Sequence, residues 1–184
     1  SCDNGWLHNT ETKTKLDSLA FKGYYTNGAG RSLQTSELRL LNVNARPGKG
    51  IFRGNLVLRD FTNPKISMQV NSDLELQFIG AFLGIKDLQR ITGHIRLTMD
   101  FRELVDISLP EKTIGKLTRG IQSELTVTNL SFRIPSYPYI VEDLDLHANM
   151  KNGFVRMDTL SFRIGHSDFQ LKGFLSNLPA IFHR

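Results

Sequence analysis

A long run of alternating apolar and polar residues is the feature that most constrains the fold of this chain. From Ile66 to Phe78, every second residue is apolar except Ser72. A period of two places alternate side chains on opposite faces of a β-strand. At about 3.3 Å per residue the run is roughly 40 Å long, whereas a typical strand has about 5–6 residues. Strands of this length build a broad sheet whose apolar face must be covered by something.

The same alternation recurs along most of the chain and predicts an antiparallel sheet. Further strands are expected at residues 16–25, 33–43, 52–58, 91–101, 121–134, 144–150, 155–164 and 169–175. The alternation changes phase at Asn129 and near Thr159, and each change predicts a bulge. Residues 77–88 have an apolar spacing nearer 3.6, which predicts a short helix on the apolar face of the sheet, and a second short helix is allowed at 111–118. We therefore predict a mostly-β fold: a long, curved, gutter-like or half-barrel-like antiparallel sheet with one or two short helices packed on its apolar face.

The composition is that of one folded domain. The 184 residues are 40 % hydrophobic and 22 % charged, which is ordinary for a globular protein. Residues 1–15 are polar and are expected to form a tail or loop, and residues 16–178 a single β domain. Residues 179–184 are expected to be a C-terminal end that continues in a longer parent chain.

The net charge of +5 is spread along the sequence. Its densest basic spot, at Arg156, Arg163 and Lys172, is interrupted by Asp158 and Asp168. Nucleic-acid-binding proteins usually concentrate their positive charge on one patch or helix. We therefore expect no nucleic-acid partner, whereas a mild attraction to anionic membrane surfaces stays open.

The single cysteine, Cys2, excludes an internal disulfide and a thiolate metal cluster. Its position near the start of the chain would suit the lipid-modified cysteine of a bacterial lipoprotein, and an incidental thiol is the alternative. No stretch approaches the roughly 20 apolar residues of a membrane-spanning helix.

The catalytic motifs that we sought are missing from the sequence. The five histidines share no metal-ligand spacing. Gly165-His166-Ser167-Asp168 contains hydrolase residue types, but neighbours on one turn cannot form a triad, so a tight turn is expected. Asp143 and Asp145 alternate on one strand, as solvated carboxylates often do. The sequence therefore predicts a protein without enzyme activity, metal or cofactor.

Three segments resemble the AsmA-like proteins of Gram-negative envelopes, a family that includes TamB-type proteins. The first is residues 52–61 followed by Pro64-Lys65-Ile66, and the second is residues 74–76, the apolar helix and residues 91–97. The third runs from Gly153 through Gly165-His166-Ser167-Asp168 to Leu178. The order of these segments along residues 16–178 carries the resemblance, since each alone is a degenerate alternating strand.

The resemblance implies an internal segment of a periplasmic protein that an absent N-terminal helix anchors to the inner membrane. It also implies a non-enzymatic function: binding or conducting phospholipid acyl chains between the inner and outer membranes, in support of outer-membrane assembly. The expected partners are a phospholipid or other acyl-chain lipid, the membrane, and neighbouring segments of the parent protein at the sheet edges. The residues predicted to line the lipid groove are Ile66, Met68, Val70, Leu74, Leu76, Phe78, Ile95, Leu97, Met99, Phe101, Leu144, Leu146 and Met150.

Two other functions fit the same alternating pattern. One is a structural β module of a larger periplasmic scaffold, with a dry core and no lipid cargo. The other is a carbohydrate-binding β domain, which calls for exposed Trp or Tyr platforms, yet the only Trp is Trp6 in the predicted tail.

Overall fold

The computed structural model describes residues 1–84, 89–106, 121–135, 137–151 and 154–175. Its elements are β1 (Cys2–Asn9), β2 (Thr14–Thr26), the 3-10 helix η1 (Leu33–Thr35), β3 (Glu37–Pro47), β4 (Ile51–Arg59), β5 (Lys65–Glu75), α1 (Leu76–Leu83), β6 (Gln89–Asp106), β7 (Ile121–Arg133), β8 (Ile140–Lys151), β9 (Phe154–Ile164) and β10 (Ser167–Leu175).

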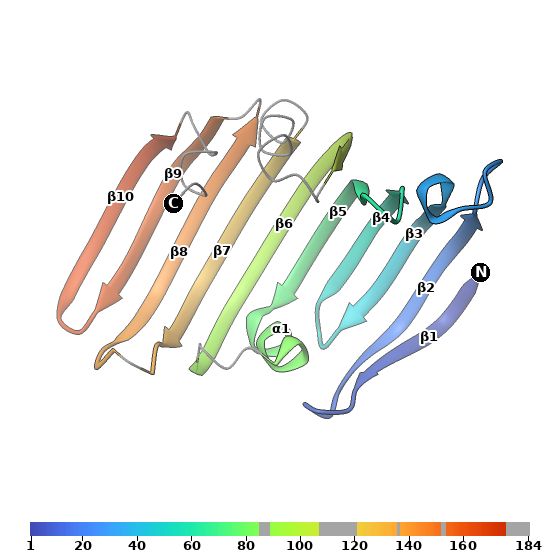
Figure 1. Cartoon of the computed structure of the whole chain (residues 1–184). Coiled ribbons are helices and arrows are strands. Elements are labelled where there is room, and N and C mark those ends of the chain that lie inside the picture. Colours follow the sequence, from blue (N-terminus) through green and yellow to red (C-terminus); the bar gives the residue numbers. More distant parts are fainter. Residues whose placement is uncertain (85–88, 107–120, 136, 152–153, 176–184) are drawn as a thin grey trace.

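The strands form one 10-stranded antiparallel sheet in which each strand lies beside its neighbours in sequence (Figure 1). Over the described residues the sheet is open, with β1 at one edge and β10 at the other. A two-residue turn between Ile164 and Ser167 joins β9 to β10. The mostly-β class, the antiparallel sheet and a short helix are thereby confirmed.

Bulges occur at the two positions where the apolar pattern changes phase. β7 has one residue more than β8 between Val127 and Leu130, and Asn129 within this stretch has a φ of 51°. β9 has one residue more than β10 between Met157 and Leu160. Each bulge returns the following apolar side chains to the same face and curves the sheet. Both predicted bulges are therefore confirmed.

The strand that contains Ile66 is shorter than its alternation predicts. β5 ends at Glu75, and Leu76 and Phe78 belong to α1 rather than to the strand row. The helical spacing prevails here because Phe78 stacks on Phe82 one turn later, with ring centroids 5.7 Å apart. The prediction that the strand continues to Phe78 is wrong for this reason.

α1 lies against one end of the sheet (Figure 1). It packs chiefly against β6 and also contacts β2 and β5. A Cβ on Gly80 would lie 2.9 Å from Cδ1 of Ile91, so the helix approaches β6 closely. Gly84 ends the helix with a φ of 66°, earlier than predicted. Residues 85–88 of the predicted helix, and the second helix at 111–118, lie outside the described residues.

The first residues form a strand and not the predicted polar tail. In β1, Gly5 lies opposite Leu19 and Leu7 opposite Leu16. The alternation is missing because β1 is a bulged edge strand whose Trp6 and Leu7 remain 61 % and 51 % exposed. Backbone pairing, which leaves no periodic trace in the sequence, holds this segment in place.

A single-layer sheet leaves much of the chain in contact with solvent. The accessible surface is 12199 Å², whereas a compact monomer of 20.9 kDa exposes about 9,000 Å². Among the described residues, the buried hydrophobic side chains are Ala45, Phe101, Ile121, Val127 and Val141. The interior is therefore small for the length of the chain, and most apolar side chains are only partly covered.

Candidate functional site

One side of the sheet, which we call the apolar face, carries apolar side chains on each strand from β3 to β9. Its members are Leu40, Val43, Ala45, Phe52, Leu56, Leu58, Ile66, Met68, Val70, Leu74, Ile95, Leu97, Met99, Phe101, Ile121, Leu125, Val127, Leu144, Leu146, Met150, Val155, Met157, Leu160 and Phe162. Because opposite residues of antiparallel strands point to the same side, the pairing register brings these positions together.

The register aligns the apolar residues into rows that cross the strands. One row runs across six strands through Leu74, Ile95, Val127, Leu146, Leu160 and Leu171. Another runs across eight strands through Ala45, Phe52, Ser72, Leu97, Leu125, Ala148, Met157 and Gly173. At about 4.8 Å between neighbouring strands the longer row extends roughly 34 Å.

A cluster of methionines surrounds a buried pair of residues on the apolar face. Phe101 and Ile121 lie opposite each other at 4 % and 7 % exposure, and Met68, Met99 and Met150 pack against them. Thioether side chains are flexible and polarizable, so they adapt to partners of varied shape. The centre of the face is therefore both apolar and deformable.

A shallow apolar depression lies beside this cluster on the same face. It has a volume of 210 Å³ and includes Leu40, Phe52, Leu56, Met68 and Val70 in its lining. It forms where Gly54 leaves a gap in the row between Val43 and Val70. Drug-sized pockets usually have about 300–1,000 Å³, so this is a groove for a slender apolar group.

The structure places eleven of the thirteen predicted lining residues in three strands of the apolar face and the other two in α1. They are Ile66, Met68, Val70 and Leu74 in β5; Ile95, Leu97, Met99 and Phe101 in β6; Leu144, Leu146 and Met150 in β8; and Leu76 and Phe78 in α1. Phe101 is buried, and the other members of the set are partly buried. Their contact with a lipid stays a prediction.

Sequence reasoning left out the strand that joins two of its predicted rows. β7 lies between β6 and β8, and its Leu125 is opposite both Leu97 and Ala148. Ile121 and Val127 of the same strand are among the best-buried side chains. Their alternation is visible in the sequence, but only the pairing order shows that β7 lies between β6 and β8.

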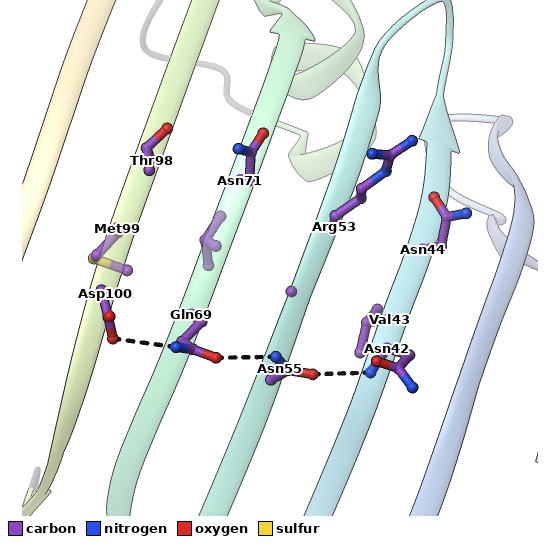
Figure 2. Close-up of a pocket in the computed structure, with 12 residues that line it drawn as sticks. Asn42, Val43, Asn44, Arg53, Asn55, Gln69, Asn71, Thr98, Met99 and Asp100 are labelled. Atoms are coloured by element: carbon purple, nitrogen blue, oxygen red, sulfur yellow. Dashed lines mark hydrogen bonds between the residues drawn. The ribbon is translucent and has the colours of Figure 1, made fainter.

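The opposite side of the sheet, the polar face, carries a row of hydrogen-bonded amides (Figure 2). The side-chain nitrogen of Gln69 donates to Asp100 over 3.4 Å, and the amide nitrogen of Asn55 donates to Gln69 over 3.0 Å. The side-chain oxygen of Asn55 accepts from the backbone N–H of Asn42 at 2.9 Å. The row lines an open hollow of 570 Å³, and its polar groups are largely hydrogen-bonded to one another.

Ion pairs cross the strands on the polar face. Arg96 contacts Asp73 at 2.8 Å, and the hydrogen bond to Asp73 raises the pKa of Arg96. Arg163 contacts Asp143 at 2.8 Å, while Asp145 accepts from the N–H of Asn129 at 2.9 Å. Asp143 and Asp145, the two carboxylates that alternate along β8, therefore have structural partners, as the sequence predicts.

Asp158 also forms electrostatic contacts across strands on the polar face. Desolvation acts to raise the pKa of Asp158, but the hydrogen bond from Asn149 and the charge of Arg156 outweigh it and hold this pKa below its usual value. His147 lies 3.2 Å from Asp158 and 3.2 Å from Glu124. These contacts tie β7, β8 and β9 together on the solvent side.

The remaining sequence candidates for chemistry occupy structural positions. Gly165 and His166 form the tight turn between β9 and β10, with a φ of 59° at Gly165. Cys2 lies in β1, and its thiol donates to the carbonyl of Leu19 at 3.5 Å. Within the described residues, no group of three or more His, Cys, Asp or Glu side chains is placed to hold a metal ion.

Among the described residues, none of the helices has the length and apolarity needed to cross a membrane. In comparisons with known proteins, no family model, curated protein or solved structure matches the chain.

Proposed function

We propose that this chain is a non-enzymatic β segment that binds acyl chains on its apolar face. The observation that carries the proposal is the open apolar face itself: seven consecutive strands contribute apolar side chains, and within the described residues α1 lies against only one end of the sheet. The surface excess over a compact monomer of this mass supports it further. A contiguous apolar surface that the chain covers only in part is typical of a binding site.

Burial of hydrocarbon supplies the binding free energy in this proposal. Each CH₂ group removed from water contributes about 0.8 kcal/mol. Rows of Leu, Ile, Val and Met side chains therefore hold a chain without any specific polar group. The methionines around Phe101 accommodate chains that differ in unsaturation or branching, because their rotamers can readjust.

The resemblance to AsmA-like proteins supports the wider setting that we propose. In that setting the chain is an internal part of a periplasmic protein anchored to the inner membrane. It conducts phospholipid acyl chains toward the outer membrane and supports outer-membrane assembly. The polar face, with its cross-strand ion pairs, then lies toward the aqueous periplasm.

Two adjacent residues of β6 provide a matched test. Met99 belongs to the apolar face, and Thr98 points to the polar face, where it is exposed. Met99→Glu would place a carboxylate in the methionine cluster, and we expect it to weaken binding of a fluorescent phospholipid at least about tenfold, since an apolar site disfavours a charge strongly. Thr98→Glu adds the same charge on the other face and should leave the affinity unchanged.

Native mass spectrometry of the purified protein provides a second readout, the presence of co-purified lipid. Circular dichroism establishes that both variants keep the fold. Equal loss of lipid in the two variants, or no lipid binding by the wild-type protein, would contradict the proposal. The second result would favour the structural-module alternative, which the open β10 edge also supports.

A further inference from the structure

The two edges of the sheet differ in ways that bear on association. β1 is irregular, with register breaks on both sides of Gly5 and a φ of 59° at Asn4. Such bulges protect an edge against pairing with another chain. β10 pairs with β9 along its whole length, and the single register shift there places the extra residue in β9. β10 therefore presents a regular outer edge.

The side chains of β10 add to this contrast. Phe169 and Leu171, on the apolar side, are 41 % and 45 % exposed. On the polar side, Asp168 and Lys172 are both exposed. Within the described part of the chain, neither of these two forms an ion pair. A regular edge with apolar side chains on one side is a template for a further strand.

We propose that β10 pairs antiparallel with the β10 strand of a second copy of this chain, with Gln170 opposite Gln170 of the other copy. A two-fold axis relates two identical edges in this way, so each contact occurs twice. The inference stands apart from the acyl-chain proposal, because it rests on the edge of the sheet and not on its apolar face.

The alternation along β10 restricts the register of such a pairing. Opposite residues point to the same side, so the apolar sides of the two copies are continuous only if odd-numbered residues lie opposite odd-numbered residues. Among the registers that satisfy this condition, the one centred on Gln170 places Asp168 opposite Lys172. It also places Phe169 opposite Leu171, which covers both exposed side chains.

Neighbouring registers lose this complementarity. A shift that centres the pairing on Asp168 places two carboxylates opposite each other, and a shift that centres it on Lys172 places two ammonium groups opposite each other. Like charges directly opposite are destabilising, and opposite charges are stabilising. The register centred on Gln170 forms two Asp–Lys pairs per dimer.

The paired molecules would form one continuous sheet of twice the width. The apolar face of one copy would continue across the β10 strands into that of the other. The row that ends at Leu171 in one molecule would then continue through Phe169 of the second.

A charge-reversal cycle tests the pairing. Asp168→Lys and Lys172→Asp each place like charges opposite each other, and we expect each to weaken dimerisation at least tenfold in sedimentation velocity. The double variant restores opposite charges and should return the dimer affinity to within about threefold of wild type. Thermal unfolding of all three variants separates a loss of pairing from a loss of fold.

Disulfide cross-linking tests the register directly. In a Cys2→Ser background, Gln170→Cys places two thiols on opposite residues about 5 Å apart at Cα, within disulfide range. Phe174→Cys is the matched control, because it is on the same strand and side, yet its two copies would be roughly 26 Å apart. We expect an intermolecular disulfide only with Gln170→Cys.

Three results would overturn the inference. The first is that the wild-type protein stays monomeric up to about 0.5 mM. The second is that the charge-reversal variants dimerise with the same affinity as the wild type. The third is that the two cysteine variants cross-link equally.

Discussion

Gly93 shows how a single residue without a side chain permits a close approach between two central strands. Its φ is 112°, and a Cβ would lie 2.7 Å from the carbonyl oxygen of Asn129 and 2.7 Å from Cα of Leu130. We expect Gly93→Ala to lower the free energy of unfolding by about 1–3 kcal/mol, because both the backbone conformation and the contact are then unfavourable. Urea denaturation measures the loss.

Gly173 is the matched control for that substitution. A Cβ there would lie 3.5 Å from the terminal methyl of Met157, an ordinary contact with a flexible side chain. Gly173→Ala should therefore change the stability little. Equal destabilisation by the two substitutions would contradict the role given to Gly93.

Glu37 makes the stability of the folded protein depend on pH. Its carboxylate accepts hydrogen bonds from Arg39 and Arg59. The bond from Arg39 is the main cause that lowers the pKa of Glu37 below its ordinary 4.5. A lowered pKa in the folded state stabilises the protein above the unfolded-state pKa, and this contribution is lost as the pH falls through the folded-state value.

Glu37→Gln should therefore reduce the melting temperature at pH 7, with the difference from wild type shrinking as the pH falls below 4.5. Thermal scans over this range measure the effect. If the difference in melting temperature stays the same below pH 4.5, lost packing and not the lost charge explains the effect of the substitution.

At the scale of elements, the bulge of β7 keeps the strand in phase with its neighbours. Asn129 adopts a φ of 51°, a conformation that asparagine tolerates and β-branched residues do not. Asn129→Val should cost about 1–2 kcal/mol of stability, whereas Asn129→Gly should cost less because glycine adopts positive φ freely. Chemical denaturation compares the two, and equal costs would contradict the conformational explanation.

At the scale of the whole molecule, the open face predicts how affinity depends on chain length. If acyl chains lie along the apolar rows, each added CH₂ contributes up to about 0.8 kcal/mol, or about fourfold in affinity. Partial exposure on an open face should reduce the gain to between about twofold and fourfold. Calorimetric titration of saturated fatty acids of increasing length measures this slope, and an affinity independent of length would contradict the proposed site.

Much of the fold could be predicted from the sequence because the relevant signals are local. The alternation around Met68 and Met99 and the phase change at Asn129 all follow from the period of a strand. Where two local signals overlapped, as at Phe78, the sequence did not decide between strand and helix. The stacking of Phe78 on Phe82 and the packing of the helix against β6 favour the helix.

The sequence by itself determined that the chain is β-rich and that one face of each long strand is apolar, because side-chain direction along a strand depends only on position. Only the tertiary structure decided that β1 is a strand, since an edge held by backbone pairing leaves no pattern in the residues. It also decided that Leu125 lies between Leu97 and Ala148 and that the apolar rows cross the whole sheet. These facts depend on register and strand order, which arise from long-range pairing rather than from any local preference.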